Sequence, residues 1–325
     1  MKYYSVRGIN AAWLLSSYLL SRPVRNPVLW GMPISAGLEL TNYCNLKCTQ
    51  CPTGSGLATR EKGYMSRALF DEINSQISRF LINTMFYFQG ESMMHPSFFE
   101  YLEEWRGKGI VISTNGHFMD LEEASHLASS PARKIIISLD GFSQDVYEKQ
   151  RPGGDIEKVK DGIVNLAKKV RGKRSVPSIE IQFLVSSINE HEQELVRKFA
   201  RDLGIGFRMK SMQILDLFHD PEILPSQKNY SRYNINEGKL AIRSKLKNHC
   251  FRLWTNPVIT WNGKVLPCCF DKDAAYELGD MNNEPFRNIW VGEKYQAFRK
   301  KILENRLCVE MCTNCTEGLD KKIRR

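Results

Sequence analysis

After Pro33, short apolar runs alternate along the chain with longer amphipathic stretches. The short runs have the length of buried strands, and the longer stretches repeat apolar residues with a helical period. This alternation predicts repeated βα units, in which parallel strands are joined by helices. Six strands are expected, at residues 35–40, 84–89, 109–114, 133–140, 178–185 and 206–212.

The amphipathic stretches between these strands predict five helices, which begin near residues 66, 96, 120, 155 and 189. Ser66 and Asp120 stand where an N-cap is expected, because their side chains can accept a hydrogen bond from the first turn. Gly204 stands where a helix is expected to end.

Consecutive βα units wind right-handedly, so the parallel sheet is expected either to curl into a barrel or to remain open and doubly wound. In both folds, chemistry belongs at the carboxyl ends of the strands. Polar residues fall there after four successive strands: Cys44, then "QGE" at 89–91, "STNG" at 113–116 and "SLDG" at 138–141. The sequence therefore predicts one functional site at this end of the sheet.

The remaining segments define the expected domain organisation. We expect an N-terminal helical extension at 1–33, a barrel at 34–215, a linker at 216–245 and a small C-terminal domain at 246–325. The linker is predicted from its weak periodicity and its prolines. The Asn262-Gly263 pair between two short apolar runs predicts a hairpin in the C-terminal domain.

The apolar stretch at residues 9–20 is too short to span a bilayer, and no small-residue cleavage pattern follows it. A cytoplasmic protein is therefore expected. The stretch has a broad apolar face beside Arg22 and Arg25, so it could lie on a membrane surface. Packing against its own domain is the favoured interpretation, and membrane contact is the alternative.

Composition adds a bias toward anionic partners. The 325 residues are 42% hydrophobic, which is enough for a full core, and the net charge is +10. The basic residues are scattered, so we expect a small anionic substrate and no nucleic acid. The dense run Lys321, Lys322, Arg324 and Arg325 is interpreted as a solvated basic tail.

Nine cysteines cluster at the two ends of the sequence, three between residues 44 and 51 and six between 250 and 315. An odd count in a long chain without an export signal indicates metal binding rather than disulfides. Cys44, Cys48 and Cys51 have no histidine nearby to complete a tetrahedral zinc site. A 4Fe-4S cluster held by three cysteines instead leaves its fourth iron open to another ligand.

This CxxxCxxC spacing, directly after the first strand, resembles the radical S-adenosylmethionine (radical SAM) superfamily over about residues 35–215. The resemblance implies a partial (β/α)6 TIM-like barrel and S-adenosylmethionine bound at the open iron. It also implies reductive cleavage to a 5'-deoxyadenosyl radical, which abstracts hydrogen from a substrate. A reductant such as flavodoxin or ferredoxin is implied as a partner.

The resemblance further implies a set of cofactor contacts. The family's GGE motif matches Gln89-Gly90-Glu91, although its first glycine is replaced here. The other implied contacts are Asn115, Ser138, Asp140 and Arg151. From the residues alone, Asn115-Gly116 could be an ordinary turn and Arg151 a helix-end cation.

The C-terminal cysteines carry a second resemblance. The spacing Cys250-x12-Gly263-x4-Cys268, with a later CxxC, is similar to the opening of the SPASM domain. Its shortened form, the twitch domain, implies one auxiliary 4Fe-4S cluster with the ligands Cys250, Cys268, Cys312 and Cys315. A zinc ribbon is the alternative. Cys269 and Cys308 are left as replacement ligands, hydrogen-atom donors or buried apolar side chains.

These features specify radical generation and not the molecule attacked. The favoured hypothesis is an oxidoreductase for a small anionic or sugar-like metabolite, whose auxiliary cluster accepts an electron. A radical epimerase and a ribosomal-peptide maturase are alternatives, and the short segment before the barrel counts against the maturase. A non-catalytic electron carrier or redox sensor is the alternative from another class. Candidate substrate-facing groups are Tyr87, His95, Lys210, Ser211 and Gln213.

Overall fold

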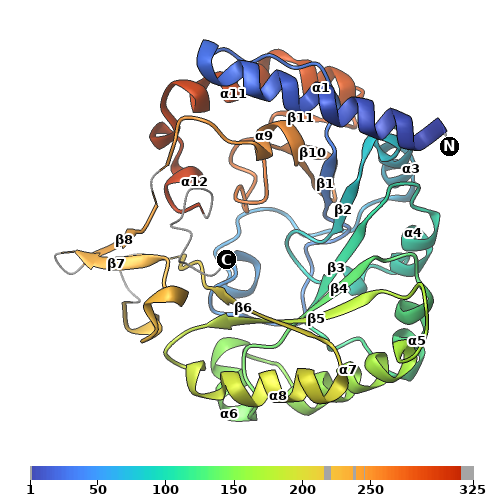
Figure 1. Cartoon of the computed structure of the whole chain (residues 1–325), viewed down its shortest axis with the longest axis vertical. Coiled ribbons are helices and arrows are strands. Elements are labelled where there is room, and N and C mark those ends of the chain that lie inside the picture. The colour runs from blue at the N-terminus through green and yellow to red at the C-terminus, as the bar shows by residue number, and fades with distance from the viewer. Residues whose placement is uncertain (1, 216–220, 237–238, 245, 316–325) are drawn as a thin grey trace. The chain divides into compact units, whose positions relative to one another are not determined.

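The computed structural model describes residues 2–215, 221–236, 239–244 and 246–315 (Figure 1). Contacts divide the chain into two compact units. The first unit comprises Met1–Tyr43, Thr59–Val111 and Leu246–Cys315, and the second comprises Cys44–Ala58, Ile112–Lys245 and Thr316–Arg325.

The first unit contains a mixed sheet with the order β11-β10-β9-β1-β2. Strands β1 (Ser35–Leu38) and β2 (Asn83–Phe86) are parallel, and β9 (Val258–Ile259) pairs in parallel with the other edge of β1. Strands β10 (Lys264–Leu266) and β11 (Gly279–Asp280) complete it in antiparallel fashion. The C-terminal cysteine-bearing segment therefore shares a sheet with the first strand, a pairing that the sequence did not predict.

Helices of this unit supply its apolar core. Ser66 caps α3 (Arg67–Ile77) by accepting a hydrogen bond from the Leu69 N–H, as predicted. The Phe70 ring of α3 stacks on Tyr101 of α4 (Phe98–Glu104), with centroids 4.0 Å apart. The other helices are α1 (Lys2–Val24), η1 (Ser78–Phe80), η2 (Ser92–Met94), α9 (Arg252–Thr255), α10 (Phe286–Val291), α11 (Glu293–Asn305), η6 (Arg306–Cys308) and α12 (Glu310–Thr313).

The second unit contains the parallel strands β4 (Lys134–Ser138), β5 (Ser178–Val185) and β6 (Gly206–Ser211) in that order. Strand β3 (Ile110–Thr114) begins in the first unit and ends in the second. Alternate residues of β5 are buried, as expected for a strand with one face on the core. Its helices are α2 (Pro52–Ser55), α5 (Leu121–Ser129), α6 (Gln144–Gln150), α7 (Ile156–Val170), η3 (Glu190–Glu192), α8 (Gln193–Leu203), η4 (Pro221–Ile223) and η5 (Lys228–Tyr230).

The six predicted strands and five predicted helices are all present, with ends shifted by a few residues. Asp120 caps α5 by accepting from two backbone N–H groups, those of Glu122 and Glu123. Gly204 ends α8 with a φ of 69°, a left-handed conformation that favours glycine. The predicted turn at Gly263, where φ is 87°, joins β9 to β10.

Part of the segment predicted as a linker forms a hairpin. Strands β7 (Tyr233–Asn236) and β8 (Lys239–Ile242) pair in antiparallel fashion. Ile214, Tyr233 and Leu240 form a small buried cluster, which gives the hairpin a core of its own. Strands this short carry too few alternations for a periodic signal, which explains why the sequence indicated only a linker.

Candidate functional site

The loop that carries Cys44, Cys48 and Cys51 lies in the second unit and closes on itself. The Cys51 N–H donates to the Cys48 carbonyl at 3.3 Å, and α2 begins directly after Cys51. A Cβ atom added to Gly54 would lie 2.5 Å from the Cys48 nitrogen, closer than real Cβ atoms approach. Glycine is therefore required for α2 to fold back against the loop.

Backbone hydrogen bonds hold this loop to the segment around α6. The Lys47 N–H donates to the Pro152 carbonyl at 3.0 Å, and the Thr49 N–H donates to the Gln150 carbonyl at 3.3 Å. Gln50 accepts a hydrogen bond from the Leu215 N–H at 3.0 Å. The cysteine loop is thus anchored through its backbone and through the Gln50 side chain.

Asn115 follows β3 and contacts the loop directly. Its Nδ2 donates to Asn45 Oδ1 at 2.8 Å and lies 3.9 Å from Cys44 Sγ. Its Oδ1 accepts from the His117 N–H at 3.0 Å. The Asn115 amide therefore orients the loop and places a hydrogen-bond donor near the Cys44 thiol. From the sequence alone, Asn115 could have belonged to an ordinary turn without these contacts.

Arg151 and Asp140 form a buried ion pair beside a second thiol. Nε and Nη2 of Arg151 both donate to Asp140 Oδ2, at 2.9 and 2.6 Å, and Nη1 lies 3.8 Å from Cys48 Sγ. The other oxygen of Asp140 accepts from the Leu184 N–H at 2.7 Å. Burial raises the pKa of the Cys48 thiol, and the guanidinium opposes that effect by favouring the thiolate.

Ser138 is the last residue of β4 and precedes Asp140 by two positions in the sequence. The structure brings the three cysteines, Asn115, Asp140 and Arg151 into one contact network of the second unit. Contacts of Asn115, Ser138, Asp140 and Arg151 with the cofactor remain predictions.

The predicted Gln89-Gly90-Glu91 turn belongs to the first unit and packs against the chain that follows β1. Gly90 has a φ of 75°, and an added Cβ would lie 2.6 Å from the Asn42 Cα. The Glu91 N–H donates to the Tyr43 carbonyl at 2.8 Å. The second glycine of the family motif is therefore required here, and binding of the methionine amino group by this turn remains a prediction.

The four cysteines predicted to hold the auxiliary cluster are all buried in the first unit, with exposed fractions of 3 to 8%: Cys250, Cys268, Cys312 and Cys315. Burial raises the pKa of Cys268, and the nearby thiols raise it further. Burial also raises the pKa of Cys312, and Cys250 adds to this. Buried thiols that raise one another's pKa are poor isolated acids but good iron ligands, since iron stabilises the thiolates.

A buried arginine contacts this group of thiols. Nη2 of Arg306 lies 3.4 Å from Cys315 Sγ, and Nη1 donates to the His249 carbonyl at 3.3 Å. Arg306 is only 3% exposed. Sequence reasoning missed this residue because a lone arginine belongs to no motif.

The two remaining cysteines differ in environment. Cys308 is exposed, unlike the four predicted ligands. Cys269 is half-buried, and its Sγ lies 3.7 Å from Arg252 Nη1. Burial and then Cys269 raise the pKa of Tyr87 to about 12, so this phenol remains protonated at neutral pH.

Two of the candidate substrate-facing groups have structural partners. His95 is buried between the Met65 carbonyl, 2.9 Å from Nε2, and the Ser97 N–H, 3.1 Å from Nδ1. Ser211 accepts a hydrogen bond from Arg232 Nε at 2.9 Å. Lys210 has a pKa lowered by burial and then by Arg208.

Within the part of the chain that the structure describes, no three His, Cys, Asp or Glu side chains are arranged to hold one metal ion. In a 4Fe-4S cluster, each thiolate binds a different iron, so the thiolates need not converge on one point.

Comparison with known families identifies the region of the early cysteines and the region of the C-terminal cysteines. The model of the radical SAM superfamily matches residues 38–197, and that of SPASM, an iron-sulfur cluster-binding domain, matches residues 250–316. The chain belongs to the radical SAM superfamily. It is a radical SAM enzyme with a C-terminal SPASM domain. Its cofactors are a 4Fe-4S cluster and S-adenosylmethionine, together with auxiliary iron-sulfur clusters of the SPASM domain.

Relatives of this radical SAM enzyme carry different activities in their names. The tungsten-containing aldehyde ferredoxin oxidoreductase cofactor-modifying protein of Pyrococcus furiosus is 25% identical over 315 residues, which are 86% of each chain. The mycofactocin maturase MftC of Mycobacterium ulcerans is 31% identical over 137 residues, which are 42% of this chain and 37% of the maturase.

Solved structures confirm the predicted fold class, a partial TIM-like barrel with a C-terminal domain. SuiB of Streptococcus suis, bound to S-adenosylmethionine, has a TM-score of 0.65 at 14% identity and covers 95% of this chain and 80% of SuiB. BtrN in complex with AdoMet and 2-DOIA has a TM-score of 0.56 at 17% identity, over 90% of this chain and 97% of BtrN. At these identities the likeness establishes the fold alone.

Proposed function

We propose that this radical SAM enzyme oxidises a small anionic or sugar-like metabolite by two electrons, and that its auxiliary cluster accepts one of them. The observation that carries the proposal is the buried group of four cysteines with Arg306 beside Cys315. Four protein thiols leave no cluster iron open to a substrate, an arrangement that suits electron transfer.

Each part of the chain has a defined task in this proposal. Cys44, Cys48 and Cys51 would hold the first cluster, which with S-adenosylmethionine supplies the 5'-deoxyadenosyl radical. Asn115 and Arg151 keep the loop in place, and the Arg151 guanidinium stabilises the charge of the Cys48 thiolate. The buried Asp140 neutralises this guanidinium and holds its orientation.

The oxidation balances when one hydrogen atom, one electron and one proton leave the substrate. The hydrogen atom goes to the 5'-deoxyadenosyl radical, the electron to the auxiliary cluster and the proton to a base or to water. A carbinol carbon would become a carbonyl. A small reductant protein, such as flavodoxin or ferredoxin, would supply the electron that starts each turnover.

A second candidate is modification of a peptide or of another enzyme's cofactor. It is favoured by the names of the relatives from P. furiosus and M. ulcerans, a cofactor-modifying protein and a maturase. The same radical would then act on a larger substrate. The two candidates share the formation of the 5'-deoxyadenosyl radical and differ in the substrate from which that radical abstracts hydrogen.

The test begins with the half-reaction that needs no substrate. The anaerobically reconstituted protein is mixed with dithionite and S-adenosylmethionine, and 5'-deoxyadenosine is measured by mass spectrometry. We expect this product from the wild type and none from the Cys44/Cys48/Cys51→Ala variant. The exposed Cys308 provides the matched control, since Cys308→Ala is expected to retain the activity.

Absence of 5'-deoxyadenosine from fully iron-loaded wild-type protein would contradict radical chemistry and favour an electron carrier. With activity established, deuterated candidate metabolites and peptides are screened for deuterium transfer into 5'-deoxyadenosine. Transfer from a metabolite carbinol supports the proposal. Transfer only from a peptide or a cofactor precursor would replace it with the second candidate.

A further inference from the structure

The inner side of α1 carries polar contacts that fix the helix to the first unit. Arg7 Nε donates to the Leu81 carbonyl at 2.9 Å. The Asn10 side chain forms two hydrogen bonds with the backbone of Met32. Its Oδ1 accepts from the Met32 N–H at 2.8 Å, and its Nδ2 donates to the Met32 carbonyl at 2.9 Å. The helix is thus held in a defined rotation about its own axis.

The outer side of α1 is apolar. Every exposed residue of this helix between positions 8 and 20 is uncharged: Gly8, Ile9, Ala12, Trp13, Leu15, Ser16, Leu19 and Leu20. Trp13 is 58% exposed and Ile9 is 53% exposed. This is the reverse of an ordinary surface helix, which turns its charged face to water. Contiguous exposed apolar side chains of this kind mark an interaction surface.

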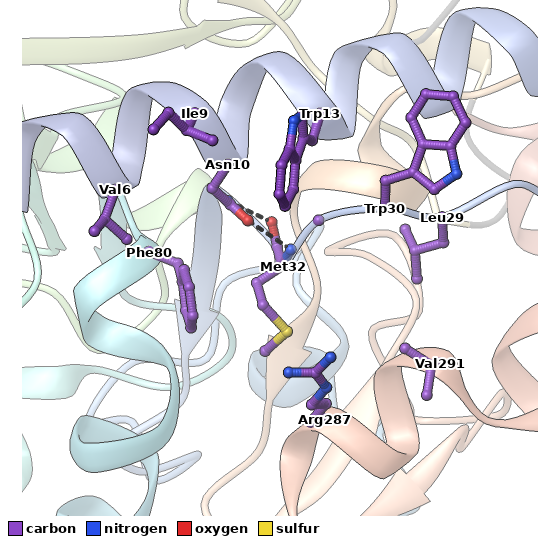
Figure 2. Close-up of a pocket in the computed structure, with 11 residues that line it drawn as sticks. Val6, Ile9, Asn10, Trp13, Leu29, Trp30, Met32, Phe80, Arg287 and Val291 are labelled. Carbon is purple, nitrogen blue, oxygen red and sulfur yellow. Dashed lines mark hydrogen bonds between the residues drawn. The ribbon is translucent and has the colours of Figure 1, made fainter.

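A hollow of about 320 Å³ continues this surface beside Trp13 (Figure 2). Trp30 and Val291, which are 53% and 49% exposed, also line it, as does the Arg287 side chain. We use the term α1 face for the exposed residues of α1 just named together with Trp30, Val291 and Arg287. Its two tryptophans are amphipathic rings of the type that concentrates at membrane interfaces.

Basic residues lie at the margin of the α1 face. The first 38 residues contain no Asp or Glu. Arg22 and Arg25 are exposed at the end of α1, and Arg79 lies over the ring of Phe80, which lines the hollow, at 4.7 Å. An apolar surface with basic residues at its margin matches an anionic lipid surface.

We propose that the α1 face rests on the surface of an anionic bilayer. Trp13, Trp30 and the apolar residues of α1 enter the boundary between headgroups and acyl chains. Arg22, Arg25 and Arg287 pair with lipid phosphates. The contact is peripheral, because no helix among the described residues is long and apolar enough to cross a membrane.

Charge argues against a second copy of this chain as the occupant. A two-fold contact would place the same surface against itself, so the arginines around both copies would be brought together. That repulsion disfavours the dimer, whereas a bilayer of anionic lipid offers phosphates to the same arginines.

The test is flotation of the full-length holoprotein with vesicles of phosphatidylcholine containing phosphatidylglycerol, at low salt. We expect binding that falls as salt rises and that is much weaker with pure phosphatidylcholine. Arg22→Gln/Arg25→Gln is expected to weaken binding about 30-fold. Trp13→Gln/Trp30→Gln is expected to weaken binding at least as much.

Leu121→Gln is the matched control, because Leu121 is an apolar residue of the second unit that is 66% exposed. It is expected to bind vesicles like the wild type. The proposal fails if the wild type does not float at low salt, or if the tryptophan variant floats as well as the control. It also fails if lipid-free protein sediments as a dimer that the tryptophan variant dissociates, which would identify a second copy as the occupant.

Discussion

Single side chains next to the thiols set the chemistry that each cysteine group supports. Arg151 and Asn115 contact the first group, and Arg306 contacts the second. A positive charge beside a thiolate favours the more negative, reduced state of any cluster bound there. The surroundings of the ligands, as well as the ligands, are therefore part of each site.

Arg306→Gln is expected to lower the reduction potential of the auxiliary cluster, because it removes a buried positive charge 3.4 Å from Cys315 Sγ. The potential is measured by redox titration monitored by electron paramagnetic resonance. The Cys44/Cys48/Cys51→Ala background isolates the auxiliary signal. Arg306→Lys retains the charge and is expected to remain closer to the wild type. An unchanged potential in a fully loaded Gln variant would rule out this role for the arginine.

His117 gives a pH dependence of stability. Its Nε2 accepts from the Asp155 N–H at 2.9 Å, so the folded protein holds the imidazole neutral, and burial lowers its pKa. The unfolded chain binds a proton at about pH 6.5. Below that pH the unfolded state binds more protons than the folded state, so the free energy of unfolding falls as the pH falls.

We therefore expect the melting temperature to fall between pH 7.5 and pH 5.5, and to fall less steeply in His117→Gln. Differential scanning fluorimetry measures both slopes. His191→Gln, at an exposed histidine, is the control and is expected to keep the wild-type slope. Equal slopes in all three proteins would show that His117 does not contribute.

Among the elements, the short helix α2 packs closely against the cysteine loop. Gly54→Ala would place a methyl group 2.5 Å from the Cys48 nitrogen, so the cysteine loop must shift. We expect the iron content to fall from about eight to about four atoms per chain, because the first cluster no longer assembles. Gly8→Ala, where a Cβ meets open space, is the control. Full iron loading of Gly54→Ala would show that the loop tolerates the shift.

The elements also show which parts of the fold can be predicted from the period of the apolar residues. Strands β4 to β6 and their helices were predictable, since long periodic stretches determine them. The two-residue strand β9 was not, because its pairing with β1 joins residues more than two hundred positions apart. The contact of Arg306 with Cys315 was missed for a related reason, since only packing of the folded chain places this arginine beside the thiols. The spacing of the cysteines, in contrast, is local and visible in the sequence.

At the scale of the whole molecule, the two cysteine groups are expected to load independently. Cys44/Cys48/Cys51→Ala should retain about four irons per chain, and so should a variant with Ala at Cys250, Cys268, Cys312 and Cys315. Iron and sulfide analysis measures both. The exposed Cys308→Ala is expected to retain about eight. Retention of full iron in the four-cysteine variant would show that the auxiliary ligands are other residues.

The parallel pairing of β9 with β1 means that the C-terminal segment protects a central strand. A truncated chain that stops before residue 246 would expose one whole edge of β1 to solvent, next to a core that has lost Trp254 and Trp290. Unprotected strand edges recruit other chains. Such a fragment is expected to be recovered in inclusion bodies, so the catalytic half cannot be prepared by simple deletion of the auxiliary half.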